Sequence, residues 1–238
     1  MQLLIKGNGY DYYVEFDYLH TTDWTINTTE LRYVFTVFNT YVDTSMDYIL
    51  EFAIVKVWSR ADLKRLLRVI SRHRNIKGVL SIRPLNDGYP KNIQVVLKGD
   101  AGDSTRYLAH ILGGVEVKAV YEDGVEHWGF LFPSSEKAYS FISMVNSHGK
   151  VSHVKEGRVT IDDLIPRVMK MATLLLSPGE LKAMKYAYDR GFFEVPRRIR
   201  LDGLAKELGI SKATLDGYIR NAVNKIIKAM FTDEDYLA

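Results

Sequence analysis

The sequence contains no cysteine among its 238 residues. This absence excludes disulfides, thiolate metal ligands and cysteine nucleophiles, and it is compatible with a cytoplasmic protein. Long apolar runs are missing too, since no stretch approaches 18 uninterrupted apolar residues and the first residues lack a signal-peptide pattern. We therefore expect a cytoplasmic protein with no membrane span.

Motifs typical of enzymes are also absent from the sequence. It has no phosphate-binding glycine loop, no dinucleotide fingerprint and no nucleophile elbow. Asp162 and Asp163 fit the start of a helix better than a pair of catalytic acids. The six histidines have no short ligand spacing, so the sequence predicts no metal, although a site assembled in three dimensions stays open. We expect no enzyme activity and no cofactor.

Charge is unevenly distributed, although the formal net charge is only +3. Residues 10–52 contain eight acids and one base, whereas residues 56–98 contain eleven Lys or Arg and two acids. Residues 177–231 contain eleven Lys or Arg and six Asp or Glu. A local basic excess of this size is typical of a phosphate-binding surface.

The first 159 residues alternate between strand-like and helical patterns. Aromatic and β-branched runs predict the strands, and amphipathic segments behind serine caps predict the helices. The expected strands are 10–18, 31–38, 48–58, 79–83, 93–98, 115–121, 125–132 and 151–159, with a hairpin turn at 122–124. Three helices are expected. The first covers 60–74 and is capped by Ser59, the second runs from a cap at Asp103 or Ser104 to about 112, and the third runs from a cap at Ser134 or Ser135 to about 147.

The alternation of strands with helices occurs in two successive sets, which indicates an α+β regulatory region over residues 1–159. We expect two small modules of the ferredoxin-like or ACT-like kind, at about 1–100 and 101–159. The apolar period then becomes helical, which predicts a connector helix over 160–175. Pro166 would occupy a first-turn position, where proline is tolerated.

The last part of the chain, residues 176–238, has the pattern of an all-α helix-turn-helix domain. Ala205 is small where two helices must cross closely. Gly209 stands where the first of these helices ends and the backbone needs a positive φ. Ser211 follows as the expected N-cap of the next helix. The apolar seam around these positions consists of Leu204, Leu208, Ile210, Leu215 and Ile219.

The helix that begins at Ser211 is the predicted recognition helix. In a helix-turn-helix, residues near the N-terminal end of this helix contact base edges in the major groove, and the helix N-terminus attracts phosphate. Thr214 can contact a base and Lys212 can reach guanine or phosphate, whereas Arg220 and Lys225 are better placed for the DNA backbone. Tyr218 either contacts DNA or is partly buried. The candidate DNA-contacting residues of this helix are Ser211, Lys212, Ala213, Thr214, Tyr218, Arg220 and Lys225.

Residues 176–226 resemble the bacterio-opsin-activator type of helix-turn-helix found in archaeal regulators. The similarity includes the leading Leu-Ser-Pro, the Tyr-Asp-Arg-Gly-Phe-Phe end of the first helix and the Val-Pro-Arg-Arg connector. It implies binding to double-stranded DNA, and it assigns a DNA contact to Arg197 and Arg198 as well. Gly217, Tyr218 and Asn221 depart from the family pattern, so the resemblance does not carry over a base preference.

The N-terminal half resembles the paired small-molecule modules attached to such domains. The cysteine of a Cys-Trp pair common in that family is absent here, where the matching residues are 22–25, and this excludes thiol-based sensing. The sequence therefore predicts a homodimeric transcription regulator with a possible small-molecule effector. A metabolite-binding enzyme subunit and a protein adaptor are the alternatives. The basic segment 60–74 is either a second DNA contact or a partner of the acidic segment 10–52.

Overall fold

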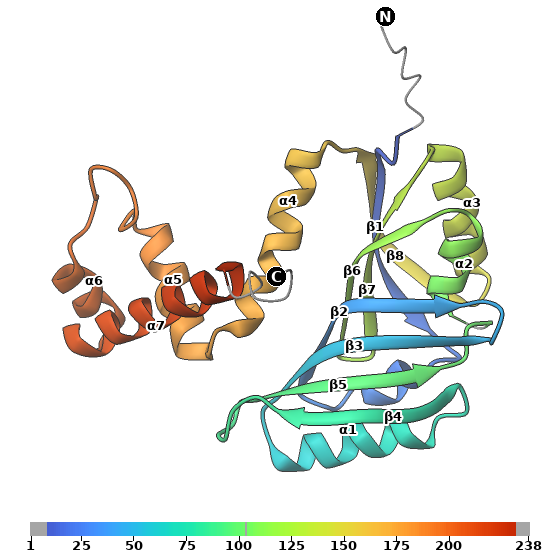
Figure 1. Ribbon diagram of the computed structural model, residues 1–238, viewed down its shortest axis with the longest axis horizontal. Helices are drawn as coiled ribbons and strands as arrows, with labels where there is room; N and C mark the ends of the chain where they lie inside the picture. Colours follow the sequence, from blue (N-terminus) through green and yellow to red (C-terminus); the bar gives the residue numbers. More distant parts are fainter. Residues whose placement is uncertain (1–8, 103, 232–238) are drawn as a thin grey trace, which may run out of the picture. The chain divides into compact units, whose positions relative to one another are not determined.

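The computed structural model describes residues 9–102 and 104–231 (Figure 1). The outer ends of the expected N-terminal and C-terminal domains, residues 1–8 and 232–238, therefore lie outside the described residues. The chain divides into two compact units, Met1–Arg167 and Val168–Ala238. Within the described ranges, no helix is long and apolar enough to cross a membrane.

The N-terminal unit is built on one eight-stranded antiparallel sheet, which confirms the α+β class. The strand order is β4-β5-β3-β2-β6-β7-β1-β8. The strands are β1 (Tyr12–His20), β2 (Tyr33–Asp43), β3 (Tyr48–Val57), β4 (Ile76–Pro84), β5 (Lys91–Gly99), β6 (Val115–Glu122), β7 (Val125–Phe132) and β8 (Gly149–Arg158). The helices are η1 (Trp24–Thr28, a 3₁₀-helix), α1 (Arg60–Arg72), α2 (Thr105–Ile111) and α3 (Ser135–Asn146).

The two halves of the sheet repeat one arrangement of strands. In the first half, the segment β2-β3-α1-β4-β5 gives the order β4-β5-β3-β2. In the second half, β6-β7-α3-β8 gives the order β6-β7-β1-β8, with β1 in the position that β5 occupies in the first half. The halves meet where β2 pairs with β6.

The predicted division into separate modules at residue 100 is not confirmed, and neither is a ferredoxin-like or ACT-like identity. The first strand of the chain, β1, lies between β7 and β8 and hydrogen-bonds to both. One hydrophobic core also runs through both halves, from Leu66 of α1 to Phe141 of α3. The physical reason is that the second half completes its set of strands only with β1, which precedes the first half in the chain, so the second half is not a continuous piece of chain.

Local sequence signals place several elements correctly. Ser59, Ser104 and Ser134 each accept a hydrogen bond from a backbone amide of the helix that follows. The turn between β6 and β7 has a positive φ at both Asp123 and Gly124, which is the geometry of a tight hairpin that favours this dipeptide. The η1 helix was not predicted, and Asp23 is its N-cap. Asp103, the alternative cap for α2, lies outside the described residues.

The predicted connector helix is shorter than expected. The α-helix α4 covers Ile161–Met169, and the chain continues as the 3₁₀-helix η2 (Lys170–Leu175). At its start, the backbone amide of Thr160 donates to Asp163 Oδ2 at 2.8 Å. Pro166 lies inside α4 rather than in its first turn, where its missing amide would have cost no hydrogen bond.

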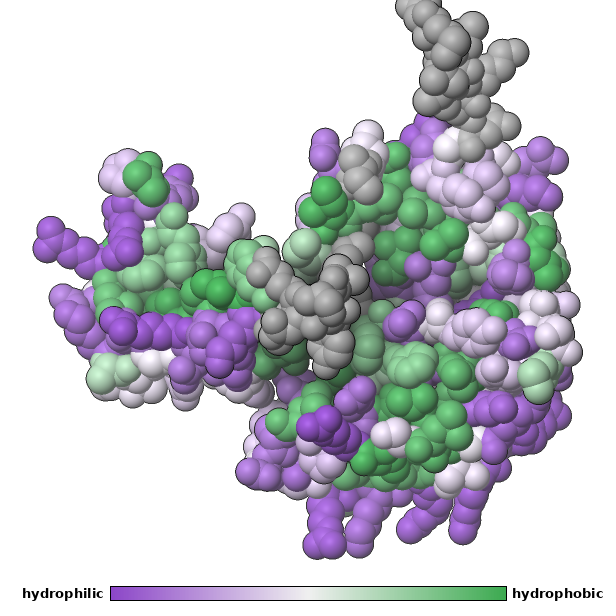
Figure 2. Space-filling view, in the orientation of Figure 1, coloured by the Kyte–Doolittle hydropathy of each residue, from purple (hydrophilic) through white to green (hydrophobic). Residues whose placement is uncertain are grey.

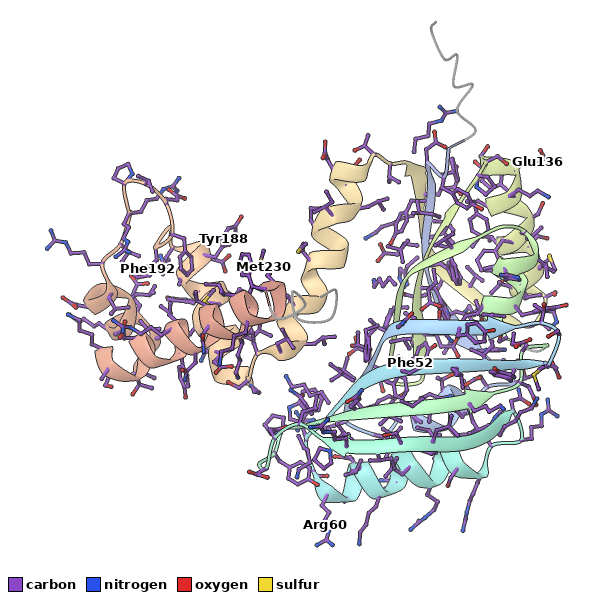
Figure 3. All side chains as sticks on the ribbon, viewed as in Figure 1. Phe52, Arg60, Glu136, Tyr188, Phe192 and Met230 are labelled. Atoms are coloured by element: carbon purple, nitrogen blue, oxygen red, sulfur yellow. The ribbon has the colours of Figure 1, made fainter. Side chains whose placement is uncertain are left out.

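The C-terminal unit consists of η2 and three α-helices, α5 (Pro178–Asp189), α6 (Leu201–Leu208) and α7 (Lys212–Phe231). Its core is formed by Ala183 and Ala187 of α5, Leu204 of α6 and Leu215 of α7. Phe192, in the loop that follows α5, belongs to the same core (labelled in Figure 3). This is the all-α helix-turn-helix arrangement that the sequence predicts.

Candidate DNA-binding surface

The turn between α6 and α7 has the geometry that the sequence predicts. Gly209 ends α6 with a φ of +68°, a left-handed conformation that strains residues with a β-carbon. Ser211 Oγ accepts a hydrogen bond from the Thr214 amide at 3.0 Å, so it caps α7. Ala205 is buried at the crossing, and Leu204 and Leu215 are fully buried beside it. These contacts fix the angle at which α7 leaves the turn.

The first turn of α7 presents a polar, solvent-accessible surface. Ser211, Lys212, Ala213 and Thr214 are all exposed, and Leu215 is the first residue of α7 that points into the core. The Thr214 hydroxyl lies 2.8 Å from Ser211 Oγ. Backbone amides at a helix N-terminus carry a partial positive charge, so this surface favours an anion such as a phosphate group.

Two basic residues of α7 have exposed acidic neighbours. Lys212 Nζ lies 2.6 Å from Asp202 Oδ1 of α6, and Arg220 Nε lies 2.9 Å from Asp216 Oδ2 one turn earlier. The hydrogen bond from Lys212 holds the pKa of Asp202 below its usual range. Exposed ion pairs contribute little to stability in water. Lys212 and Arg220 can therefore exchange these partners for phosphate at small cost.

Tyr218 and Lys225 contact the protein itself on the side of α7 that packs against α5. The Tyr218 ring covers Gly179, where an added β-carbon would lie 2.9 Å from the ring. Lys225 Nζ donates to Glu180 Oε2 at 2.7 Å. Both contacts fasten α7 to the first turn of α5. The assignment of these two residues to DNA stays a prediction, and the partial burial weighed for Tyr218 is what the structure shows.

Glu180 is a buried carboxylate at the start of α5. It completes a capping box with Ser177, whose amide donates to Glu180 Oε2 at 2.7 Å. Burial raises the pKa of Glu180, but the hydrogen bonds from Lys225 and Ser177 outweigh burial and hold this pKa below its usual range. The carboxylate is therefore ionised at neutral pH and engages the Lys225 charge.

Arg197 and Arg198 lie in the loop between α5 and α6. The Arg197 guanidinium stands 4.6 Å from the centroid of the Phe192 ring, in a cation–π contact with a core residue. Arg198 covers Gly191, which has a φ of +70°, and its Nε forms an ion pair with Glu194. Both arginines are exposed, so each presents its positive charge to solvent.

The basic helix α1 has one acidic partner in segment 10–52 within the described part of the chain. Arg65 Nη2 lies 3.4 Å from Glu30 Oε2, and both side chains are largely exposed. Arg60, Lys64, Arg68 and Arg72 are exposed as well, and hydrophilic side chains cover the outer face of α1 (Figure 2). The pairing of α1 with the acidic segment therefore rests on one exposed ion pair among the described residues.

A group of side chains able to hold a metal ion lies in the N-terminal unit. His20, Asp23 and Glu126 each offer one ligand atom, and these atoms all lie within 4.8 Å of one another. The sequence does not reveal this group because Glu126 comes from β7, more than 100 positions from His20. The pairing of β1 with β7 brings them together.

Comparison with known proteins agrees with the geometry of the C-terminal unit. Residues 176–228 match the sequence model of a family described as "HTH DNA binding domain". The match confirms the resemblance of these residues to the bacterio-opsin-activator type of helix-turn-helix. No curated protein and no solved structure matches the chain.

Proposed function

We propose that the protein is a sequence-specific transcription regulator that binds double-stranded DNA. The observation that carries this proposal is the N-terminal turn of α7, where the Ser211 cap places Lys212, Ala213 and Thr214 together on an exposed surface. Side chains in this position of a helix-turn-helix reach base edges in the major groove. The family match over residues 176–228 supports the same use of the domain.

The DNA contacts divide into two kinds under this proposal. Lys212 and Thr214 contact base edges, and Ala213 lets the helix approach the groove closely. Arg220, Arg197 and Arg198 contact phosphates and set the position of the domain without reading bases. Tyr218 and Lys225 act mainly through α5, since their contacts with Gly179 and Glu180 orient α7.

Substitution of Lys212 by alanine is expected to weaken specific DNA binding about 5- to 150-fold, because a good base contact contributes about 1–3 kcal/mol. The Arg197→Ala/Arg198→Ala double variant is expected to weaken binding to all duplexes alike, because phosphate contacts carry no sequence information. The measurement is a mobility-shift titration of the full chain on its own upstream DNA, with unrelated DNA as competitor.

Lys185→Ala is the matched control for this experiment. Lys185 is exposed on α5 and has no predicted DNA contact, so its variant should bind as the wild type does. If Lys212→Ala and the double arginine variant both keep wild-type affinity at physiological salt, the assigned surface is wrong.

The proposed regulator acts as a homodimer. One recognition helix contacts few base pairs, whereas two half-sites a helical turn apart add their contributions. The distal end of α7 supports this proposal, because Ile227, Met230 and Phe231 are 49%, 62% and 64% exposed. Met230 is labelled on this end of α7 in Figure 3. Apolar side chains grouped on one exposed surface are typical of an interface.

The mass of the full chain in solution tests the dimer. We expect twice the chain mass at micromolar concentration by sedimentation, and a shift toward the monomer for the Ile227→Glu/Met230→Glu variant. Lys228→Gln, which lies between the two changed positions, should leave the mass unchanged. A wild-type protein that stays strictly monomeric at this concentration would contradict the proposal.

The N-terminal unit is the proposed sensor of a small molecule or a partner. An open groove of about 660 Å³ supports this role, since its volume lies in the range of small-molecule sites. Its lining includes Arg32, Trp58 and His127, which offer a cation, an aromatic surface and an imidazole.

A further inference from the structure

Three side chains that could bind a metal ion converge at one end of β1. His20 is the last residue of this strand, Asp23 is the N-cap of η1, and Glu126 stands on the neighbouring strand β7. His20 Nδ1 lies 3.4 Å from Glu126 Oε1, and both side chains are almost fully buried. Strand pairing and helix capping fix the backbone positions of all three residues.

Hydrogen bonds from neighbouring side chains hold the Glu126 carboxylate in place. Thr25 Oγ1 donates to Glu126 Oε1 at 2.8 Å, and Trp128 Nε1 donates to Glu126 Oε2 at 2.8 Å. Each carboxylate oxygen has a second lone pair, so Glu126 can still bind a cation. Ligating side chains in metal sites are typically oriented by such outer hydrogen bonds.

The carboxylates around this cluster are not all neutralised by neighbouring basic side chains. Asp23, Glu51 and Glu126 line one small cavity together with Arg106. Arg106 is already shared, since it forms ion pairs with both Glu51 and Glu116. A buried cation would offset this excess of negative charge.

The cavity itself has room for one small occupant. Its volume is about 30 Å³, and His20, Asp23 and Glu126 all line it. Glu51 Oε2, which belongs to another residue of the lining, is buried and has no hydrogen-bond partner among the described residues. An oxygen in this state is an unused acceptor in the wall of the cavity.

We propose that His20, Asp23 and Glu126 form a binding site for one divalent transition-metal cation. One imidazole nitrogen and two carboxylate oxygens are a ligand set that Zn²⁺ and Mn²⁺ accept. Two ligands at 2.1 Å from an ion in tetrahedral geometry are about 3.4 Å apart, which matches the His20–Glu126 distance. The site does not depend on the proposed DNA binding, and it is tested without DNA.

The test is a titration of the EDTA-treated full chain with Zn²⁺ and, separately, Mn²⁺. Calorimetry and elemental analysis should show one bound equivalent per chain, and the fluorescence of the nearby Trp128 should change on binding. Asp23→Asn should weaken binding at least tenfold, because it removes the charged ligand but keeps the oxygen that caps η1. Thr25→Val should weaken binding about 10- to 100-fold, because it releases the Glu126 carboxylate.

Asp17→Asn/His127→Gln is the matched control. These residues form another carboxylate–imidazole pair of the N-terminal unit, with His127 Nδ1 at 2.6 Å from Asp17 Oδ1, and their loss should leave binding unchanged. The denaturant midpoint of the metal-free Asp23→Asn variant should equal or exceed that of the metal-free wild type. This result would show that the variant is folded before metal is added.

Two results would overturn the proposal. The first is that the EDTA-treated wild type takes up neither metal at micromolar concentration. In that case His20 and Glu126 form only an ion pair with each other. The second is wild-type affinity in both Asp23→Asn and Glu126→Gln. DNA binding that fails while one metal equivalent is bound would contradict the proposed function and leave the metal site intact.

Discussion

Substitution of Leu215 by alanine is expected to destabilise the C-terminal unit by about 2–5 kcal/mol and to abolish DNA binding. Leu215 is completely buried where α6, α7 and α5 meet, and it is the first core residue after the Ser211 cap. The loss of its side chain leaves a cavity in a small helical unit. Small domains have little stability in reserve, so a loss of this size unfolds a large part of the population.

The chain offers a clean way to measure this effect. Its three tryptophans, Trp24, Trp58 and Trp128, all lie in the N-terminal unit, so their fluorescence follows that unit alone. Leu215→Ala should lower the urea midpoint of the helical circular dichroism signal and leave the fluorescence midpoint unchanged. Tyr188→Ala, on the exposed face of α5, is the control and should cost much less. Equal midpoints for Leu215→Ala and the wild type would contradict the assigned core.

Substitution of Arg106 by methionine is expected to destabilise the N-terminal unit by about 3–5 kcal/mol, because it leaves buried carboxylates without their cation. The Arg106 side chain is only 5% exposed and lies between Glu51 and Glu116. Its guanidinium also stands 4.7 Å from the centroid of the Trp128 ring. Methionine replaces most of the side-chain volume, so the expected loss comes mainly from charge.

Tryptophan fluorescence during urea unfolding measures this second effect. Arg106→Met should lower the fluorescence midpoint. Arg65→Met, the same change in an exposed pair with Glu30, should be close to neutral. If both variants lose equally little stability, the ion pairs of Arg106 with Glu51 of β3 and Glu116 of β6 do not stabilise the N-terminal unit.

The sequence predicted the helix-turn-helix well because its signals are local. Gly209 and Ser211 act on the backbone within two or three residues, and the structure shows the positive φ and the N-cap at these positions. The serine caps of α1, α2 and α3 and the turn at Asp123–Gly124 are local in the same sense.

Contacts between residues far apart in the chain could not be predicted from the sequence. Nothing near β1 indicates that it pairs with β7 and β8, so the sequence predicts a division at residue 100 and does not reveal the convergence of His20 with Glu126. The helical periodicity of α7 predicts that Tyr218 and Lys225 lie at the surface of the helix. Only the packing of α5 against α7 shows that Tyr218 contacts Gly179 and Lys225 contacts Glu180. The family resemblance covers residues 176–226 and could not supply the fold of the first unit.

The salt dependence of DNA affinity tests the central claim most directly. A basic helix-turn-helix surface that binds phosphates releases counterions, so the logarithm of the binding constant should fall linearly with the logarithm of salt concentration. We predict a steep slope for the wild type and a slope smaller in magnitude by about 0.9 for each lost phosphate contact in Arg197→Ala/Arg198→Ala. Binding that is independent of salt, or a slope unchanged in this variant, would contradict the claim and favour a protein adaptor.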